Sequence, residues 1–163
     1  QPHADPRHGR RDGADGHVRH ANRPGQPVRD VRLDYSKRWQ HQRLGRLVAS
    51  YRSSPYFDHY APLFEPFYRR SPEFLADLDL GLLEVLCRQA RIPMPALSER
   101  YVEAAPGDTD LRPKHREGPA FIAEPYYQVF SDRMPFEANL SFADLLFAEG
   151  PAAASVLARC RPE

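Results

Sequence analysis

Residues 71–92 read SPEFLADLDLGLLEVLCRQARI and carry the strongest helix signal in the chain. Ser71 followed by Pro72 is typical of a helix start, because a proline at the first helical position loses no hydrogen bond. We expect the helix to end at Ile92, since Pro93 follows it. Apolar residues recur at helical spacing along one face and predict that it is buried: Phe74, Leu78, Leu82, Val85 and Leu86.

The residues that precede this helix predict a strand and two further helices. Val31, Leu33 and Tyr35 alternate with charged residues, which is the period of a half-buried strand. After Ser36, an apolar stripe at helical spacing predicts a helix over 37–52. The next helix starts after Ser53 or Ser54, and we expect it to be short, kinked or split. The cause is that two prolines within it lack amide protons, namely Pro62 and Pro66.

The residues that follow it are dominated by a long loop. Residues 93–124 are rich in proline and contain one candidate strand, at 100–104. Ser141 with Asp144 three positions later resembles a capping box at the start of another helix. Gly150 and Pro151 end that helix, and a last one is expected over 152–160.

Length and composition favour one globular domain. The chain has 163 residues, 18.7 kDa and a formal net charge of +1. Its two cysteines exclude a disulfide-rich secreted scaffold, and Cys87 is expected to be a core thiol. No apolar run is long enough to span a bilayer, so we expect a cytoplasmic protein without a membrane span.

The first residues of the chain differ in composition from the rest. Residues 1–30 contain no aromatic residue, so we expect the folded domain to occupy 27–163 and residues 1–26 to be a disordered or mistranslated tail. The tail also resembles an out-of-frame translation of GC-rich DNA. Its histidines lack the spacing of a zinc site, so no metal is expected. The remainder is nearly neutral, and we therefore expect no nucleic-acid partner.

Two polar clusters are the candidates for ligand binding. The first comprises Asp34, Ser36, Lys37 and Arg38, at a junction between strand and helix where an anion such as a phosphate can bind. The alternative is that its cations are simply solvated. The second comprises Tyr126, Tyr127 and Gln128, whose rings and amide suit a sugar or a base. Its alternative is a buried aromatic segment. No catalytic residue and no cofactor is assigned.

Read in order, these stretches resemble the C-terminal part of the WbqC-like protein family of bacteria, in the form seen in Bacteroidetes-type genomes. The resemblance rests on residues 28–40, on the middle helices between Ser54 and Leu80, and on 125–151, which include Asn139. Family members usually begin with a strand and an aromatic-rich helix that are not found here. The resemblance therefore implies an N-terminally truncated WbqC-like domain. Its expected fold is α+β, mainly helical, a fragment of a larger α/β domain with a few short strands.

The resemblance implies a role in surface polysaccharide biosynthesis, such as that of O-antigen. An enzyme acting on a nucleotide-linked or amino sugar fits the two polar clusters, with a sugar or sugar nucleotide as partner. The alternatives are a non-catalytic binding or scaffold protein of a polysaccharide assembly system, or an inactive remnant. An enzyme requires that Asp34, Lys37, Tyr127 and Asn139 converge on one pocket, because catalytic groups act at hydrogen-bond reach. A scaffold predicts separate surfaces.

Overall fold

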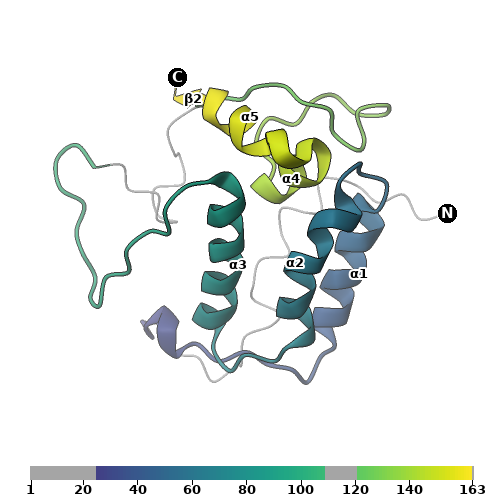
Figure 1. Ribbon diagram of the computed structural model, residues 1–163. Helices are drawn as coiled ribbons and strands as arrows, with labels where there is room; N and C mark the ends of the chain where they lie inside the picture. The colour runs from purple at the N-terminus through teal and green to yellow at the C-terminus, as the bar shows by residue number, and fades with distance from the viewer. Residues whose placement is uncertain (1–24, 109–120, 163) are drawn as a thin grey trace.

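The computed structural model describes residues 25–108 and 121–162. In this part of the chain, three helices stand side by side, and two shorter helices lie across one of their ends (Figure 1). The elements are, in order, η3 (Val28–Asp30), α1 (Trp39–Tyr51), α2 (Phe57–Arg69), α3 (Leu75–Ala90), β1 (Phe121–Ile122), α4 (Phe142–Glu149), η5 (Gly150–Ala152), α5 (Ala153–Arg159) and β2 (Arg161–Pro162).

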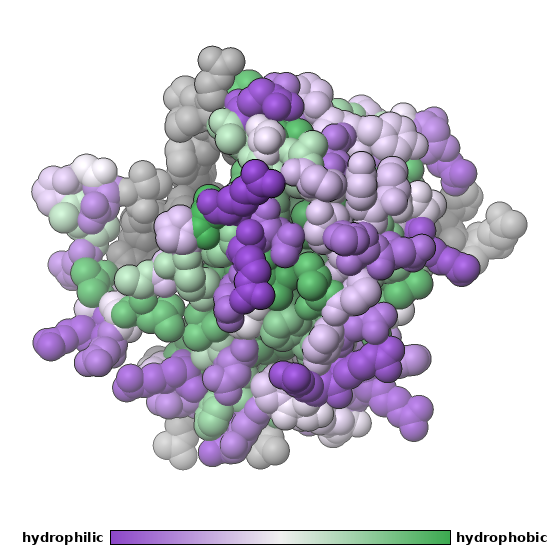
Figure 2. All heavy atoms as spheres, in the orientation of Figure 1, coloured by the Kyte–Doolittle hydropathy of each residue, from purple (hydrophilic) through white to green (hydrophobic). Residues whose placement is uncertain are grey.

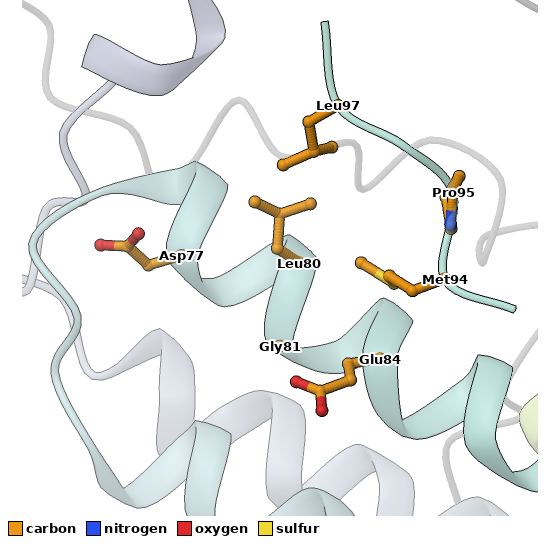
Figure 3. Close-up of a pocket in the computed structure, with 7 residues that line it drawn as sticks. All are labelled: Asp77, Leu80, Gly81, Glu84, Met94, Pro95 and Leu97. Carbon is orange, nitrogen blue, oxygen red and sulfur yellow. The ribbon is translucent and has the colours of Figure 1, made fainter.

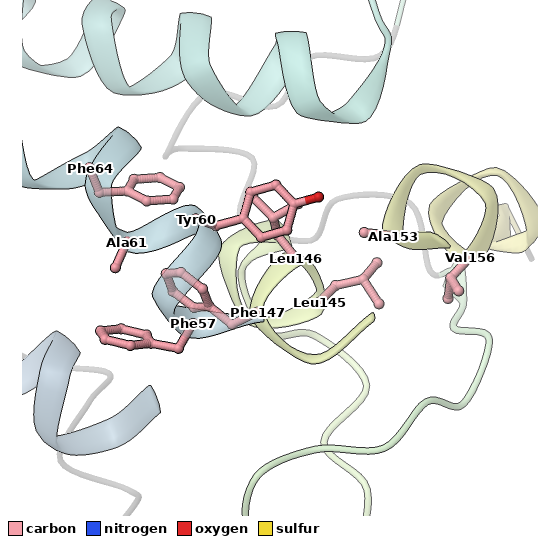
Figure 4. Packing of buried hydrophobic residues seen from close by; sticks show 9 residues of the cluster. All are labelled: Phe57, Tyr60, Ala61, Phe64, Leu145, Leu146, Phe147, Ala153 and Val156. Atoms are coloured by element: carbon pink, nitrogen blue, oxygen red, sulfur yellow. The ribbon is translucent and has the colours of Figure 1, made fainter. Parts of the chain in front are cut away.

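The upper core lies where α4 and α5 cross the ends of the three long helices. Helix α2 contacts both α1 and α3, and α4 contacts α2 and α3. Phe147 of α4 is fully buried, and its ring centroid lies 5.3 and 5.7 Å from those of Phe57 and Phe64 (Figure 4). The Tyr51 ring of α1 lies 5.1 Å from it. The buried members of the upper core are Phe57, Tyr60, Ala61, Phe64, Leu145, Leu146, Phe147, Ala153 and Val156.

A smaller basal core lies at the opposite end of the three helices. Its buried members are Leu33, Trp39 and Leu78, and Tyr68 and Leu82 pack against both cores. The Leu33 amide donates to the Glu73 carbonyl at 3.0 Å. This hydrogen bond ties the segment before α1 to the segment before α3.

The helix expected over 71–92 begins later than predicted. Helix α3 starts at Leu75 because Phe74 before it is extended and pairs with Arg32, in the segment that precedes α1. Leu75 donates its amide to the Val31 carbonyl at 2.8 Å, so a tertiary hydrogen bond satisfies an amide at the start of the helix that has no partner within it. The helix ends at Ala90, with Arg91 in the left-handed conformation.

Helix α2 is continuous, so the expectation of a short, kinked or split helix is wrong. Pro62 and Pro66 are four residues apart and both exposed, as is Asp58. The carbonyl groups that lose their donors therefore lie on one solvent-facing side, where water satisfies them. Neither Ser53 nor Ser54 caps this helix.

The start of α2 is set by a tertiary contact. Tyr56 donates its amide to the Phe147 carbonyl at 3.0 Å and occupies the N-cap position. Its ring lies over Gly150, where an added Cβ would be 2.5 Å from the ring, so this position has to be glycine. The Ser54 hydroxyl is buried with no hydrogen-bond partner in the described part of the chain.

The strand content is smaller than an α+β fold requires. The mainly helical character is confirmed, but residues 31–35 form isolated bridges at Arg32 and Leu33 in place of a strand, and 100–104 form no strand. In the described residues the only sheet is the antiparallel pair β1–β2, in which Phe121 faces Pro162 and Ile122 faces Arg161. The α+β class is therefore not confirmed. The expected tail at 1–26 lies almost wholly outside the described residues.

Candidate functional site

The first candidate surface, here called the basal polar cluster, comprises Asp34, Ser36, Lys37 and Arg38. An Asp34 carboxylate oxygen accepts from the Ser36 amide at 2.8 Å, and the Asp34 carbonyl accepts from the Trp39 indole at 2.9 Å. Asp34 thus shapes the turn into α1. Ser36, Lys37 and Arg38 are exposed.

The start of α1 keeps the electrostatic character expected for an anion site. Its first turn contains no acidic residue and receives no side-chain cap. The unpaired amide groups at the N-terminus of a helix carry partial positive charge, and Lys37 and Arg38 add to it. Three of its four members are exposed to solvent, and the Lys37 and Arg38 carbonyls accept from the amides of Trp39 and Gln42 at the start of α1. It can attract an anion, because exposed cations lie at a helix start.

The second candidate surface is the aromatic loop, residues 125–140. The Tyr127 side chain is 60% exposed, and Phe130, Met134, Phe136 and Leu140 are also exposed. Asn139 is exposed near the loop's end. Apolar rings in solvent next to polar groups are typical of a binding surface.

Gln128 holds the aromatic loop in shape. Its side chain is buried, donates to the Glu137 carbonyl at 2.8 Å and accepts from the Glu137 amide at 3.0 Å. Its backbone amide also donates to the Ser131 hydroxyl. Both hydrogen-bonding ends of the amide are therefore occupied by the loop itself. Gln128 is a positioning residue here, and it does not point toward a ligand.

Tyr126 leads from the loop into the upper core. Its hydroxyl donates to the Asp144 carboxylate at 2.6 Å, and its ring meets the Phe136 ring edge to face at 5.5 Å. The alternative of a buried aromatic segment describes Tyr126, whereas Tyr127 next to it faces solvent. One adjacent pair of tyrosines thus divides between the core and the surface.

Asp144 is a buried carboxylate that the sequence analysis assigned to a capping box. The N-cap of α4 is formed by Ser141 alone, whose hydroxyl accepts from the Ala143 amide. Burial raises the pKa of Asp144, and hydrogen bonds from Tyr126 and Tyr51 partly offset that rise. Burial and the Asp144 carboxylate together raise the pKa of both tyrosines. The available signal in the sequence is an acid inside the apolar run from Phe142 to Ala148.

The two candidate surfaces do not meet. The basal polar cluster lies at the Trp39 end of α1, whereas the aromatic loop approaches the Tyr51 end through Asp144 (Figure 1). At 1.5 Å per residue, Trp39 and Tyr51 are about 18 Å apart along the helix axis. The four residues whose convergence an enzyme requires are thus divided between opposite ends of the molecule.

A separate hollow lies between α3 and the extended segment that follows it, with a volume of about 610 Å³ (Figure 3). None of the predicted site residues lines it. The residues that line the hollow are Asp77, Leu80, Gly81, Glu84, Met94, Pro95 and Leu97. On the face of the molecule seen in Figure 1, Figure 2 shows hydrophobic residues in the middle and hydrophilic residues around them.

The described residues form a small helical domain, and the two candidate surfaces on it are separate. None of the helices in residues 25–108 and 121–162 is long and apolar enough to cross a membrane. Within the same ranges, no group of His, Cys, Asp and Glu side chains is arranged to hold a metal ion.

The sequence model of the WbqC-like protein family matches residues 17–113, more than half of the chain, and the chain belongs to this family. The matched range contains the basal polar cluster and helices α1 to α3, and it ends before the aromatic loop. No curated protein and no solved structure matches the chain.

Proposed function

We propose that this protein takes part in the biosynthesis of bacterial surface polysaccharide, such as O-antigen, and binds a sugar or sugar-nucleotide precursor. Membership of the WbqC-like family supports the general role. The aromatic loop supports the sugar contact, because exposed rings stack on the apolar faces of sugars while neighbouring polar groups bond their hydroxyls.

Tyr127 is the central residue of the proposed sugar contact. Its ring is exposed, and Gln128 beside it is fixed by two hydrogen bonds to Glu137, so the ring stands on a preorganised loop. Preorganisation lowers the entropy lost on binding. Asn139 supplies an exposed amide on the same loop.

The protein acts in this proposal as a non-catalytic binding or scaffold protein. The observation that carries this choice is that the basal polar cluster and the aromatic loop lie at opposite ends of α1, whose first and last residues are about 18 Å apart. An enzyme that used both would need them at hydrogen-bond reach of one substrate. We propose a cytoplasmic location, because the free thiols of Cys87 and Cys160 would stay reduced there. We expect no nucleic-acid partner.

Titration of the protein with a panel of nucleotide-linked sugars and amino sugars, followed by NMR, tests this proposal. We expect shifts confined to residues 125–140 and a loss of affinity of about tenfold in Tyr127→Ala, equivalent to about 1.4 kcal/mol. Tyr101→Ala is the matched control, because Tyr101 is 63% exposed but lies outside the loop. Unchanged affinity in Tyr127→Ala, or turnover of any panel member, contradicts the proposal.

A further inference from the structure

The positive charges of this chain are unevenly distributed. Between Asp34 and Asp58 there is no acidic residue, although the chain as a whole has a net charge of only +1. This acid-free stretch includes the whole of α1. Its cationic residues are Lys37, Arg38, Arg43, Arg46 and Arg52.

The solvent-facing side of α1 collects most of these charges into one surface, here called the basic face. The exposed positions recur every three or four residues, as expected for one side of a helix. On the opposite side, Trp39 is in the basal core, and Leu47, Val48 and Tyr51 pack against the upper core. The exposed residues of the face are Arg38, His41, Gln42, Gly45, Arg46, Ala49 and Arg52.

The basic face continues beyond the start of α1. The exposed Lys37 directly precedes Arg38, and the Gln40 side chain donates to the Arg70 carbonyl, which holds the backbone of the exposed Arg70 at the first turn of α1. In the described part of the chain, none of these three cations is held in an ion pair. Arg52, at the far end of α1, also has no ion pair among the described residues. Cations are thus available at both ends of a helix about 20 Å long.

The composition of the basic face indicates the kind of partner. It contains no large apolar residue, and Gly45 and Ala49 occupy its middle. Protein interfaces depend on aromatic or aliphatic anchors that become fully buried, and this face offers none. Single-stranded nucleic acids are bound with stacking aromatic rings, which are also missing except for His41. An anionic membrane surface needs neither, because it attracts clustered Lys and Arg electrostatically.

We propose that the basic face of α1 docks the protein peripherally on membrane surfaces that carry anionic phospholipid headgroups. Arg38 and Arg52, with Lys37 and Arg70 at one end, contact the phosphates, and Gly45 and Ala49 allow close approach to the headgroup layer. The aromatic loop approaches the Tyr51 end of α1 through Asp144 (Figure 1), and the proposal does not use it. This docking site is independent of the proposed sugar contact.

Sedimentation of the full chain with lipid vesicles tests this proposal. We expect binding to vesicles that contain phosphatidylglycerol, no binding to phosphatidylcholine alone, and release by salt. Arg38→Gln/Arg52→Gln should weaken partitioning about 30-fold, because each arginine near an anionic surface contributes about 1 kcal/mol. Arg88→Gln/Arg100→Gln is the matched control, since it removes the same charge from exposed positions outside α1. It should change partitioning less than about threefold.

Three results would overturn the proposal. The first is that the unmodified protein does not bind phosphatidylglycerol vesicles. The second is an equal loss in both variant pairs, which would assign the binding to net charge alone. The third is tighter binding of a single-stranded oligonucleotide than of the vesicles, which would make the face a nucleic-acid surface. Circular dichroism of both pairs checks that the helices are unchanged.

Discussion

Tyr51 and Tyr126 face the Asp144 carboxylate from α1 and from the aromatic loop, so this residue joins three parts of the chain. A buried charge is tolerated where hydrogen bonds replace its lost hydration. Tyr126→Phe removes one donor and should cost about 1–3 kcal/mol of unfolding free energy. Urea denaturation at neutral pH measures it. Tyr127→Phe, an exposed neighbour, should change stability by less than about 0.5 kcal/mol, and equal losses in the two variants would contradict this role for Tyr126.

The raised pKa of Asp144 also predicts how stability varies with pH. Burial lifts it above its ordinary value of 3.8, so the folded state holds the proton more tightly than the unfolded chain does. The stabilisation is therefore complete below pH 3.8 and is lost as pH rises through the raised pKa. Asp144→Asn has no such titration. Urea denaturation of both proteins across acidic pH compares their unfolding free energies. As pH rises, the original protein should lose stability relative to Asp144→Asn, and parallel curves would refute a raised pKa of Asp144.

At the scale of elements, the Phe67 ring of α2 packs directly against Gly81 of α3. A Cβ added there would lie 2.4 Å from a ring carbon of Phe67, closer than any real contact. Gly81→Ala should therefore lower the unfolding free energy by about 1–3 kcal/mol through overpacking. Gly45→Ala on the open side of α1 is the matched control, and it should raise stability by up to about 1 kcal/mol because alanine favours helix. Thermal denaturation compares them, and two changes of the same sign would be inconsistent with this packing.

The sequence predicts the elements whose causes are local. The apolar stripes anticipate α1 and α3, and the Ser141 cap anticipates the start of α4, because a few neighbouring residues determine each. The starts of α2 and α3 were misplaced because tertiary hydrogen bonds set them, from Tyr56 to Phe147 and from Leu75 to Val31. Such contacts between distant segments leave no local pattern.

The candidate site follows the same rule. The helix-start cations and the exposed Tyr127 are properties of short segments, so the sequence could propose them. That Gln128 holds its own loop together, and that Asp144 is buried beneath Tyr126, depends on residues nine and 18 positions away. The separation of the two polar clusters depends on the direction of α1, which a single sequence does not specify.

At the scale of the whole molecule, the two cores are expected to unfold as one unit. Tyr68 and Leu82 pack against both, so loosening one core removes contacts from the other. Trp39 is the only tryptophan of the chain and lies in the basal core, so its fluorescence reports on that end alone.

Phe147→Leu in the upper core should cost about 1–2 kcal/mol through lost packing and ring contacts. If the cores are coupled, the variant's thermal midpoint falls equally by Trp39 fluorescence and by circular dichroism of the helices. A Trp39 transition that stays at the original midpoint while the helical signal shifts would mean that the cores unfold independently. The basal polar cluster would then remain folded after the aromatic loop has lost its support.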